Sequence, residues 1–508
     1  MSSIKKLAGE TVWYGVSSIV SKFMVQLLTP YLTAKFRGTP EFGQMALVYS
    51  ATPFLSIAVL FGLDYAYFRY FVRKDIDRSE LYSTLLISLF TSTILITSVI
   101  LLFHVPLARL LDVANHPAYI TLSALIISLD ALSALPFARL RQEGRPRKYA
   151  FVRISGVLVY ITFVFFFLSV CPRLLKTHPN SVIALIYQPR FGFVGYVLLA
   201  NVIQNAFQLF LLSPLLKLPR WTFNSSLLRN VIPYSLPLMV AGLGGMINET
   251  FDRVMLDWRL PHENNYAILQ VGIYSGCYRL SLLVTVFVQA FRMGAEPFFL
   301  RQSVEESAQR TYARVMKFFV ILVCGIFLFV MLYIDVLKYF IQDPSMYVGL
   351  KVVPILLFAN MFLGIYYNLS IWYKLSSNTN PGAYITLIGA GITLVVNYAF
   401  IPAYGYMASA WATFLCYASM MVISYIWGQK VYPVPYAWKK LVAYMVIALF
   451  VYLVFWGLRS LSGNLVYRLA VGTVLLAGYG IFILRVERKE FRRLPVIGKY
   501  LGGRPQAA

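Results

Sequence analysis

Acidic residues, cysteines and charged side chains in general are scarce in this chain of 508 residues. Charged residues make up 13% of the sequence, whereas soluble proteins contain about 25%. The four cysteines are far apart, which argues against a disulfide framework and against the closely spaced ligands of a zinc site. The sequence contains no P-loop, nucleophile elbow or metal-binding motif, and no polar stretch long enough for a soluble domain. We therefore expect neither a soluble enzyme nor an ATP-driven pump, and no catalytic residue, metal site or cofactor.

Hydrophobic residues make up 59% of the sequence, and the mean hydropathy is +0.69. They form fourteen apolar runs, each of about the 20 residues that a helix needs to cross a bilayer. The runs cover residues 11–33, 42–66, 81–103, 117–138, 149–170, 191–213, 230–251, 268–291, 316–333, 350–371, 383–402, 404–427, 441–458 and 466–484. This pattern predicts an all-α polytopic membrane protein with about 14 transmembrane helices.

Basic residues outnumber acidic ones, 45 to 20, and most of them lie in the short segments between the apolar runs. If both termini are cytoplasmic, the inner segments contain 30 Lys and Arg residues and the outer segments contain 12. This difference follows the positive-inside rule. We therefore expect a multi-pass protein with both termini in the cytoplasm. Its positive charge would contact anionic membrane lipids rather than nucleic acid.

Similar motifs recur in the same order in the two halves of the chain. Gly43 and Tyr49 match Gly272 and Tyr278 at an offset of 229 residues, and further matches follow downstream. We predict two six-helix repeats, an N-lobe with the first six spans and a C-lobe with the next six, then two extra C-terminal helices and a basic cytoplasmic tail. These parts cover residues 1–213, 214–427, 428–484 and 485–508. Such tandem repeats are typical of alternating-access transporters, in which the substrate path lies between the halves.

Lys22 lies near the middle of the first apolar run, too deep for its amine to reach the membrane surface. It shares one polar helix face with Gln26, and a polar face in hydrocarbon must meet protein or water. One interpretation is the basic wall of a substrate cavity. The other is a buried lysine paired with an acid such as Asp130, which is itself a functional candidate because it is a deep intramembrane acid.

Arg279 lies in the eighth run beside a polar stripe that includes Tyr274 and Tyr278. A guanidinium group presents a planar fork that suits phosphate oxygens, so this stripe is a second candidate wall of the cavity. The alternative is an interhelical tether from Arg279 to Glu249 or Asp252.

The seventh run contains Pro233 and Pro237, which interrupt backbone hydrogen bonding and predict a helix that bends as a gate. Near its end, Glu249 and Arg253 are four residues apart, as expected for an ion pair on one helix face. Alternatively, Glu249 or Asp252 is a carboxylate that couples transport to Na⁺ or H⁺.

The sixth run carries a stripe of amide side chains that includes Asn201 and Asn205. Amides at helical spacing can bind the hydroxyl groups of sugars, and they can equally hold neighbouring helices together. The sequence leaves both interpretations open.

Three motifs carry a family resemblance: Val271-Gly272-Ile273-Tyr274, Gly294-Ala295-Glu296-Pro297-Phe298 and Ile401-Pro402-Ala403-Tyr404-Gly405. Together with the six-plus-six-plus-two arrangement, they resemble the multidrug/oligosaccharidyl-lipid/polysaccharide (MOP) transporter superfamily, and within it the Wzx-type polysaccharide or O-antigen flippases. The resemblance implies a protein of the bacterial inner membrane that moves undecaprenyl-pyrophosphate-linked oligosaccharide repeat units by alternating access. Such flippases serve the biosynthesis of O-antigen (part of lipopolysaccharide), capsule or exopolysaccharide.

The resemblance also implies that Lys22 and Arg279 hold the pyrophosphate, because they lie in spans comparable to those of the basic cavity residues in related lipid II flippases. The implied partners are the lipid-linked oligosaccharide, anionic lipids, a polysaccharide polymerase and a ligase. Since no nucleotide site is present, we expect a Na⁺ or H⁺ gradient to drive transport. Two alternatives remain: a cation-coupled multidrug exporter of the MATE type and a membrane glycan polymerase.

Overall fold

The computed structural model describes residues 15–71, 73, 75–179, 187–188, 191–217, 222–302, 307–375 and 380–491. These residues form helices and connecting turns, and none of them is in a β-strand. Thirteen of the helical segments are long and apolar enough to cross a membrane. The prediction of an all-α polytopic membrane protein is therefore confirmed.

The long helices begin and end close to the predicted apolar runs. They are α3 (Glu41–Leu60), α5 (Arg78–Leu102), α7 (Ala118–Gln142), α8 (Pro146–Phe165), α11 (Gly192–Leu216), α12 (Ser225–Arg259), α13 (Tyr266–Gln302), α14 (Ala308–Leu332), α16 (Val353–Leu369), α18 (Asn380–Tyr404), α19 (Tyr406–Val431), α20 (Trp438–Arg459) and α21 (Leu465–Val486). Shorter elements are α2 (Thr29–Lys35), α4 (Leu63–Phe71), α6 (His104–Leu110), η1 (Phe166–Val170), α9 (Cys171–Thr177), η3 (Glu263–Asn265), α15 (Ile334–Leu337), η4 (Lys338–Phe340), η5 (Pro344–Val352), α17 (Ile371–Leu375) and α22 (Arg488–Phe491).

The first predicted run does not form one continuous helix in the described part of the chain. Residues 15–26 are helical, a turn follows at Leu27 and Leu28, and α2 then continues the run. Pro30 lies in the first turn of α2, where its missing N–H is tolerated but cannot extend the preceding helix. We call residues 15–26 the first helix.

The second predicted run is divided into α3 and α4 at Gly62. This glycine has a φ of +76°, a conformation that side chains disfavour. A Cβ atom at this position would also lie only 2.6 Å from the backbone oxygen of Ser235 in α12. Gly62 therefore permits both the sharp turn and the close contact between α4 and α12.

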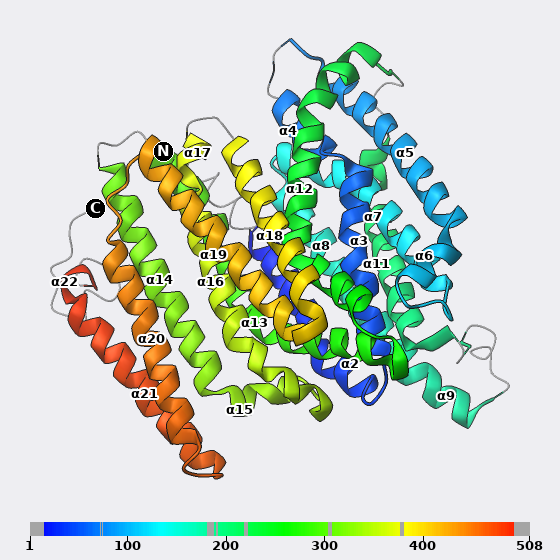
Figure 1. Cartoon of the computed structure of the whole chain (residues 1–508). Helices are drawn as coiled ribbons and strands as arrows, with labels where there is room; N and C mark the ends of the chain where they lie inside the picture. The colour runs from blue at the N-terminus through cyan, green and yellow to red at the C-terminus, as the bar shows by residue number, and fades with distance from the viewer. Residues whose placement is uncertain are drawn as a thin grey trace.

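The helices pack in two groups on either side of α3, α12 and α13 (Figure 1). In one group, α7 contacts α5, α8 and α11; in the other, α19 contacts α16 and α18. Helix α12 packs on both α3 and α18, and α13 packs on both α3 and α16. The first helix lies against α13, as the hydrogen bonds described below show. These central helices therefore hold the two groups together. Whether the groups are two copies of one repeat stays a prediction.

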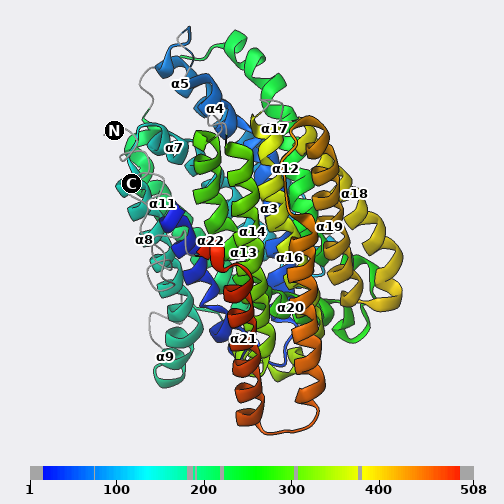
Figure 2. The same ribbon diagram turned by 90° about the vertical axis from the view of Figure 1, so that its left-hand side faces the viewer.

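The pair α20 and α21 packs on the outside of α14 (Figure 2). At one end, Lys317 of α14 forms an ion pair of 2.6 Å with Glu487, which also accepts a hydrogen bond of 2.6 Å from Tyr444. At the other end, Arg459 and Arg468 both contact Asp335, at 2.6 and 3.5 Å. Buried carboxylates thus attach the two extra helices at both of their ends.

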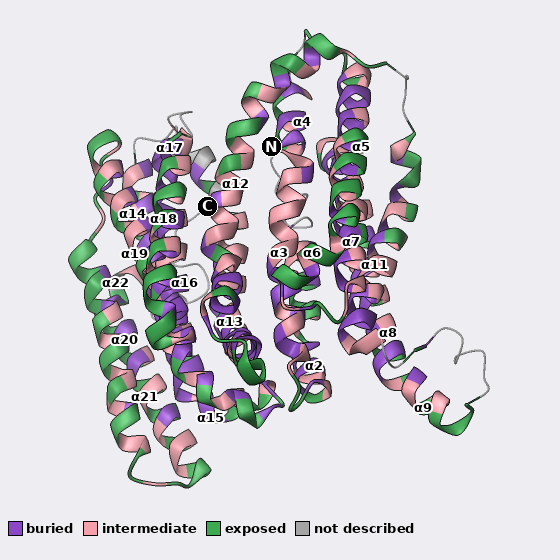
Figure 3. Cartoon of the chain, turned by 45° about the vertical axis from the view of Figure 1, so that its right-hand side comes forward, coloured by how far each residue is buried: buried purple, intermediate pink, exposed green. Residues whose placement is uncertain are grey.

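Large apolar side chains are exposed along the outermost helices, where Figure 3 shows exposed residues on α5, α20 and α21. Leu102 is 77% exposed, Val474 71% and Phe450 64%. A soluble protein rarely exposes such a continuous apolar surface, whereas a membrane protein presents it to lipid. The outer surface therefore agrees with the hydropathy of the sequence.

Helix α12 continues through both Pro233 and Pro237. Figure 3 shows the helix curving along its length. Each proline removes one backbone hydrogen bond, which lowers the resistance of the helix to bending. The use of this curvature as a gate stays a prediction.

Candidate substrate-binding site

Three hydrogen bonds that involve the predicted site residues join α13 to the first helix and to the start of α2. Lys22 donates from Nζ to Oε1 of Gln289 at 2.8 Å. Gln26 donates from Nε2 to the backbone oxygen of Arg279 at 3.2 Å, and Arg279 donates from Nη1 to Oγ1 of Thr29 at 2.7 Å. The structure thus brings Lys22, Gln26 and Arg279 to one helix–helix boundary, although they are about 250 residues apart in sequence.

Neither cation of this boundary forms an ion pair within the described residues. The hydrogen-bond acceptors of Lys22 and Arg279 are a neutral amide and a neutral hydroxyl group. The pairing of Lys22 with Asp130 and the tether from Arg279 to Glu249 or Asp252, both considered above, are not formed. Because no carboxylate neutralises them there, the two cations keep their positive charge for an anionic ligand.

Two tyrosines, one on α3 and one on α8, lie near Arg279. Tyr49 and Tyr160 both lie within electrostatic range of its guanidinium group, and Asn201 donates a hydrogen bond of 3.1 Å to the hydroxyl of Tyr49. The amide of Asn201 therefore reaches the site through Tyr49. Sequence reasoning did not assign Tyr49 to the site, although the repeat match with Tyr278 was an available signal.

A third basic residue, Arg292, lies farther along α13. Arg292 is exposed, and its guanidinium carbon lies 4.5 Å from the ring centre of Tyr367 in α16. The apolar run is predicted to end at residue 291, which would place Arg292 in the segment that follows it. In the structure α13 extends to Gln302, so Arg292 lies on the same helix as Arg279 and Gln289.

Tyr274, Asp252 and Arg253 form a separate buried network. Tyr274 donates from its hydroxyl to Oδ2 of Asp252 at 2.6 Å, and Arg253 pairs with Oδ1 at 2.9 Å. The guanidinium carbon of Arg253 also lies 4.5 Å from the ring centre of Tyr278. Asp252 is 2% exposed and Tyr274 is fully buried. Here the charges neutralise each other, so this network holds α12 against α13 and presents no free charge to a ligand.

The prediction of an ion pair between Glu249 and Arg253 is wrong. The Arg253 side chain turns inward to Asp252 and contacts only the backbone oxygen of Glu249, at 3.0 Å. The Glu249 side chain is exposed and has no ion pair in the part of the chain that the structure describes. Helical spacing places the two residues close together, but the Arg253 side chain packs against Tyr278 and pairs there with Asp252 instead of Glu249. Glu249 is therefore an accessible carboxylate beside the site.

Asn205 and Asp130 lie away from the boundary between the first helix and α13. Asn205 is buried and donates to the backbone oxygen of Ile126 at 3.1 Å, so it links α11 to α7. Asp130 is half-buried, has Arg153 as its charged neighbour and makes no hydrogen bond to any described residue. The geometry favours a packing role for Asn205 and leaves the Asp130 carboxylate available for a proton or cation.

Comparison with known proteins identifies relatives in sequence and in structure. The family model described as "Polysaccharide biosynthesis protein" matches residues 8–301, more than half of the chain. Among curated protein sequences, no relative matches the chain.

Solved structures share the fold at low sequence identity. The lipid II flippase MurJ in an inward closed conformation has a TM-score of 0.67 and 13% identity, over 93% of this chain and 99% of that one. An inward-facing multidrug resistance MATE family transporter of the MOP superfamily has a TM-score of 0.56 and 13% identity, over 87% and 94%. An outward-facing one has a TM-score of 0.56 and 12% identity, over 86% and 96%. The chain therefore has the fold of MOP superfamily transporters, as the sequence resemblance predicted.

Proposed function

Since the chain belongs to the polysaccharide biosynthesis protein family, we propose that it is a flippase for lipid-pyrophosphate-linked oligosaccharide. The substrate headgroup would enter between the two predicted lobes from the cytoplasmic face of the bacterial inner membrane and leave on the outer face. Its lipid tail would remain in the bilayer. The likeness in fold to a lipid II flippase, a protein that acts on another lipid-linked substrate, supports this proposal.

The observation that carries the proposal is the pair of unneutralised cations at the boundary between the first helix and α13. Lys22 and Arg279 hydrogen bond only to neutral groups among the described residues. A pyrophosphate would replace those neutral acceptors with charged oxygens, and charge-assisted hydrogen bonds are about twice as strong as neutral ones. Arg253, by contrast, already has a carboxylate partner and is unsuited to this role.

The remaining site residues receive supporting roles in this proposal. Gln26 and Asn201 are amides near Arg279 that would contact the first sugar or the phosphate oxygens. Glu249 and Asp130 are the carboxylates that would bind a coupling Na⁺ or H⁺. Pro233 and Pro237 would let α12 bend as the lobes move. A polymerase and a ligase would use the translocated product.

A cation-coupled multidrug exporter is the second candidate, because MATE transporters share the fold and because Glu249 offers an exposed carboxylate to an organic cation. The two candidates differ in which charges the substrate needs. A flippase of an anionic lipid depends on Lys22 and Arg279, whereas an exporter of cations depends on Glu249 and gains nothing from the two basic residues.

The deciding experiment deletes the gene and determines the membrane leaflet in which lipid-linked repeat units accumulate. Trapping of intact units on the cytoplasmic face supports the flippase. Trapping on the outer face would indicate a polymerase, and sensitivity to cationic drugs without glycolipid accumulation would indicate an exporter.

Variants then test the site. We expect Lys22→Gln and Arg279→Gln to fail to complement the deletion, because each keeps a hydrogen-bonding side chain but loses its charge. Lys35→Gln and Arg310→Gln are the matched controls, since both remove one positive charge away from the boundary. Full complementation by Lys22→Gln and Arg279→Gln would contradict the site assignment.

A further inference from the structure

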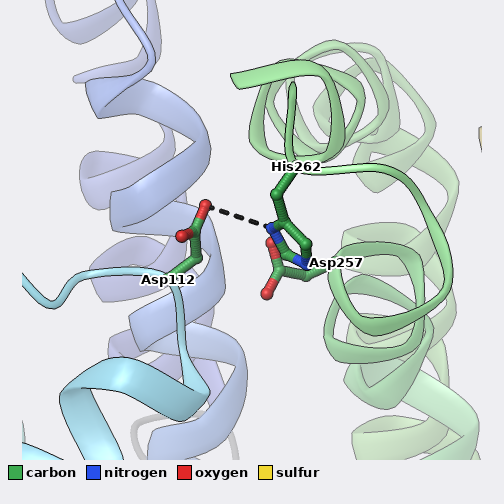
Figure 4. A group of neighbouring side chains, drawn as sticks. All are labelled: Asp112, Asp257 and His262. Atoms are coloured by element: carbon green, nitrogen blue, oxygen red, sulfur yellow. Dashed lines mark ion pairs between the residues drawn. The ribbon is translucent and has the colours of Figure 1, made fainter. Parts of the chain in front are cut away.

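Three side chains that can bind a metal ion meet where α12 is connected to α13 (Figure 4). Asp112 follows α6, Asp257 lies in the last turn of α12, and His262 lies in the connection to α13. One potential ligand atom from each residue lies within 4.8 Å of the other two. His262 Nδ1 is 3.6 Å from Oδ2 of Asp112. The cluster therefore joins a segment of the first half of the chain to a segment of the second.

Asp257 lacks the partners that a buried carboxylate needs. It is 1% exposed, and its Oδ1 atom is buried without a hydrogen-bond donor among the described residues. Burial of an unpaired carboxylate is costly, so such groups usually pair with a cation or bind a metal. The neighbouring Arg259 does not fill this need, because its guanidinium carbon lies 4.2 Å from the ring centre of Tyr398 in α18. An unsatisfied oxygen thus remains inside a group of metal-binding side chains.

We propose that Asp112, Asp257 and His262 form a binding site for a divalent transition-metal cation. Zn²⁺ fits this donor set best, because it binds histidine nitrogen and carboxylate oxygen and is often held by three protein ligands with one open position. Mg²⁺ and Ca²⁺ prefer sites made of oxygen alone, usually with more protein or water ligands. The cation would supply the partner that Asp257 lacks. Sequence reasoning missed the site because Asp112 is distant in sequence from the other two residues.

The position of the cluster gives the bound cation a mechanical effect. The segment that carries Asp112 already touches α12, since Trp258 donates from Nε1 to the backbone oxygen of Leu110 at 3.2 Å. A cation shared between Asp112 and the α12–α13 connection would strengthen this contact. If the lobes separate here during transport, as the proposed function requires, the cation favours the state in which this end is closed. Binding itself does not depend on the proposed function.

The binding test uses the full-length protein in lipid nanodiscs, titrated with ZnCl₂, MnCl₂ and MgCl₂ by calorimetry. We expect one saturable Zn²⁺ site per chain and at least tenfold weaker Zn²⁺ binding by Asp257→Asn, His262→Ala and Asp112→Asn. Asparagine is chosen at position 112 because it tolerates the φ of +48° found there. His178→Ala and Asp75→Asn, which alter exposed residues elsewhere, should bind Zn²⁺ as the native chain does. Equal affinity in the native chain and in Asp257→Asn and His262→Ala, or no saturable binding, would overturn the site.

Measurement of the unfolding temperature distinguishes a variant that has lost Zn²⁺ binding from one that has failed to fold. Without metal, Asp257→Asn should unfold at a higher temperature than the native chain, because it removes a buried charge that has no partner. Zn²⁺ should raise the unfolding temperature of the native chain by more than that of Asp257→Asn. A rise of equal size in both proteins would contradict the proposal.

The mechanical effect is tested separately by spin labels at Asn115 and Asn264, two exposed positions on either side of the cluster. Zn²⁺ should increase the population with the shorter distance in the native background and have no effect with Asp257→Asn. If Zn²⁺ binds but leaves the distances unchanged, the proposed effect on the conformation is overturned while the binding site stands. Because neither measurement involves transport, failure of the flippase proposal would be seen independently in the leaflet assay.

Discussion

Gly43 of α3 and Gly272 of α13 pack directly against each other. A Cβ atom on Gly272 would lie 3.4 Å from the backbone nitrogen of Gly43, and one on Gly43 would lie 3.2 Å from that of Gly272. The two glycines are also matched positions of the predicted repeat. In a repeat, equivalent residues of the two halves touch each other only near the symmetry axis, so the axis of the predicted repeat would pass between α3 and α13 at this contact.

The two glycines of this contact differ in whether they tolerate a methyl group. A Cβ on Gly43 would lie 2.1 Å from the backbone oxygen of Ile268, whereas a Cβ on Gly272 meets only ordinary contacts. We expect Gly43→Ala to lower the free energy of unfolding by about 1–3 kcal/mol, as overpacking does. Gly272→Ala should change it by less than about 0.5 kcal/mol. Unfolding in detergent measures both variants, and equal losses would contradict the packing described.

Replacement of Arg253 should lower the free energy of unfolding far more than replacement of an exposed arginine. Arg253→Leu leaves the buried Asp252 charged and without its cation, which should cost about 3–5 kcal/mol of unfolding free energy. The double variant with Asp252→Asn should recover part of this loss. Arg73→Ala is the control, because the pair with Asp75 is more than half exposed and should contribute about 0–1 kcal/mol. A similar effect of both single variants would show that Arg253 is not a buried ion-pair partner.

The attachment of α21 should weaken in acid because of Glu487. Burial alone would raise the pKa of Glu487, but hydrogen bonds from Lys317 and Tyr444 hold it below its ordinary value. A lowered pKa stabilises the fold above the pKa of the unfolded state, and this stabilisation is lost as the pH falls through the folded pKa.

The corresponding variant is Glu487→Gln. We expect it to speed hydrogen exchange in α21 at pH 7, and the difference from the native chain to shrink as the pH falls below the ordinary pKa of a glutamate and to disappear below the lowered pKa of Glu487 in the folded state. Glu263→Gln, which alters an exposed glutamate, should have no such effect. A difference that grows in acid would contradict the role of Glu487.

The hydroxyl of Tyr49 should matter for transport more than that of Tyr31. Tyr49 accepts a hydrogen bond from Asn201 beside Arg279, whereas the hydroxyl of Tyr31 bonds to that of Ser169 at 2.6 Å. Loss of one hydrogen bond is worth about 1 kcal/mol, so Tyr49→Phe should slow translocation roughly fivefold. Tyr31→Phe loses one hydroxyl as well and should transport at the native rate. Equal rates in both variants would remove Tyr49 from the site.

The fold class and the positions of the long helices follow from the sequence alone. A helix that crosses a bilayer must satisfy its backbone internally and present apolar side chains, so length and hydropathy are sufficient to find it. The breaks at Pro30 and Gly62 were not predicted as breaks, because hydropathy does not report backbone geometry. Lys22 and Arg279 could be singled out for a similar reason, since a cation in an apolar run is costly and therefore conspicuous.

Which side chains pair with one another depends on how the helices pack, and the sequence did not predict it. Arg253 pairs with Asp252 and not with Glu249. Tyr274 donates a hydrogen bond within the same buried network, and Lys22 donates one to Gln289 of a helix distant in sequence. The cluster of Asp112, Asp257 and His262 exists because the segment after α6 meets the last turn of α12 and the connection to α13. Periodicity along one helix predicts neighbours on that helix, but the rotation and crossing of other helices determine which charges are buried, paired or left available for a ligand.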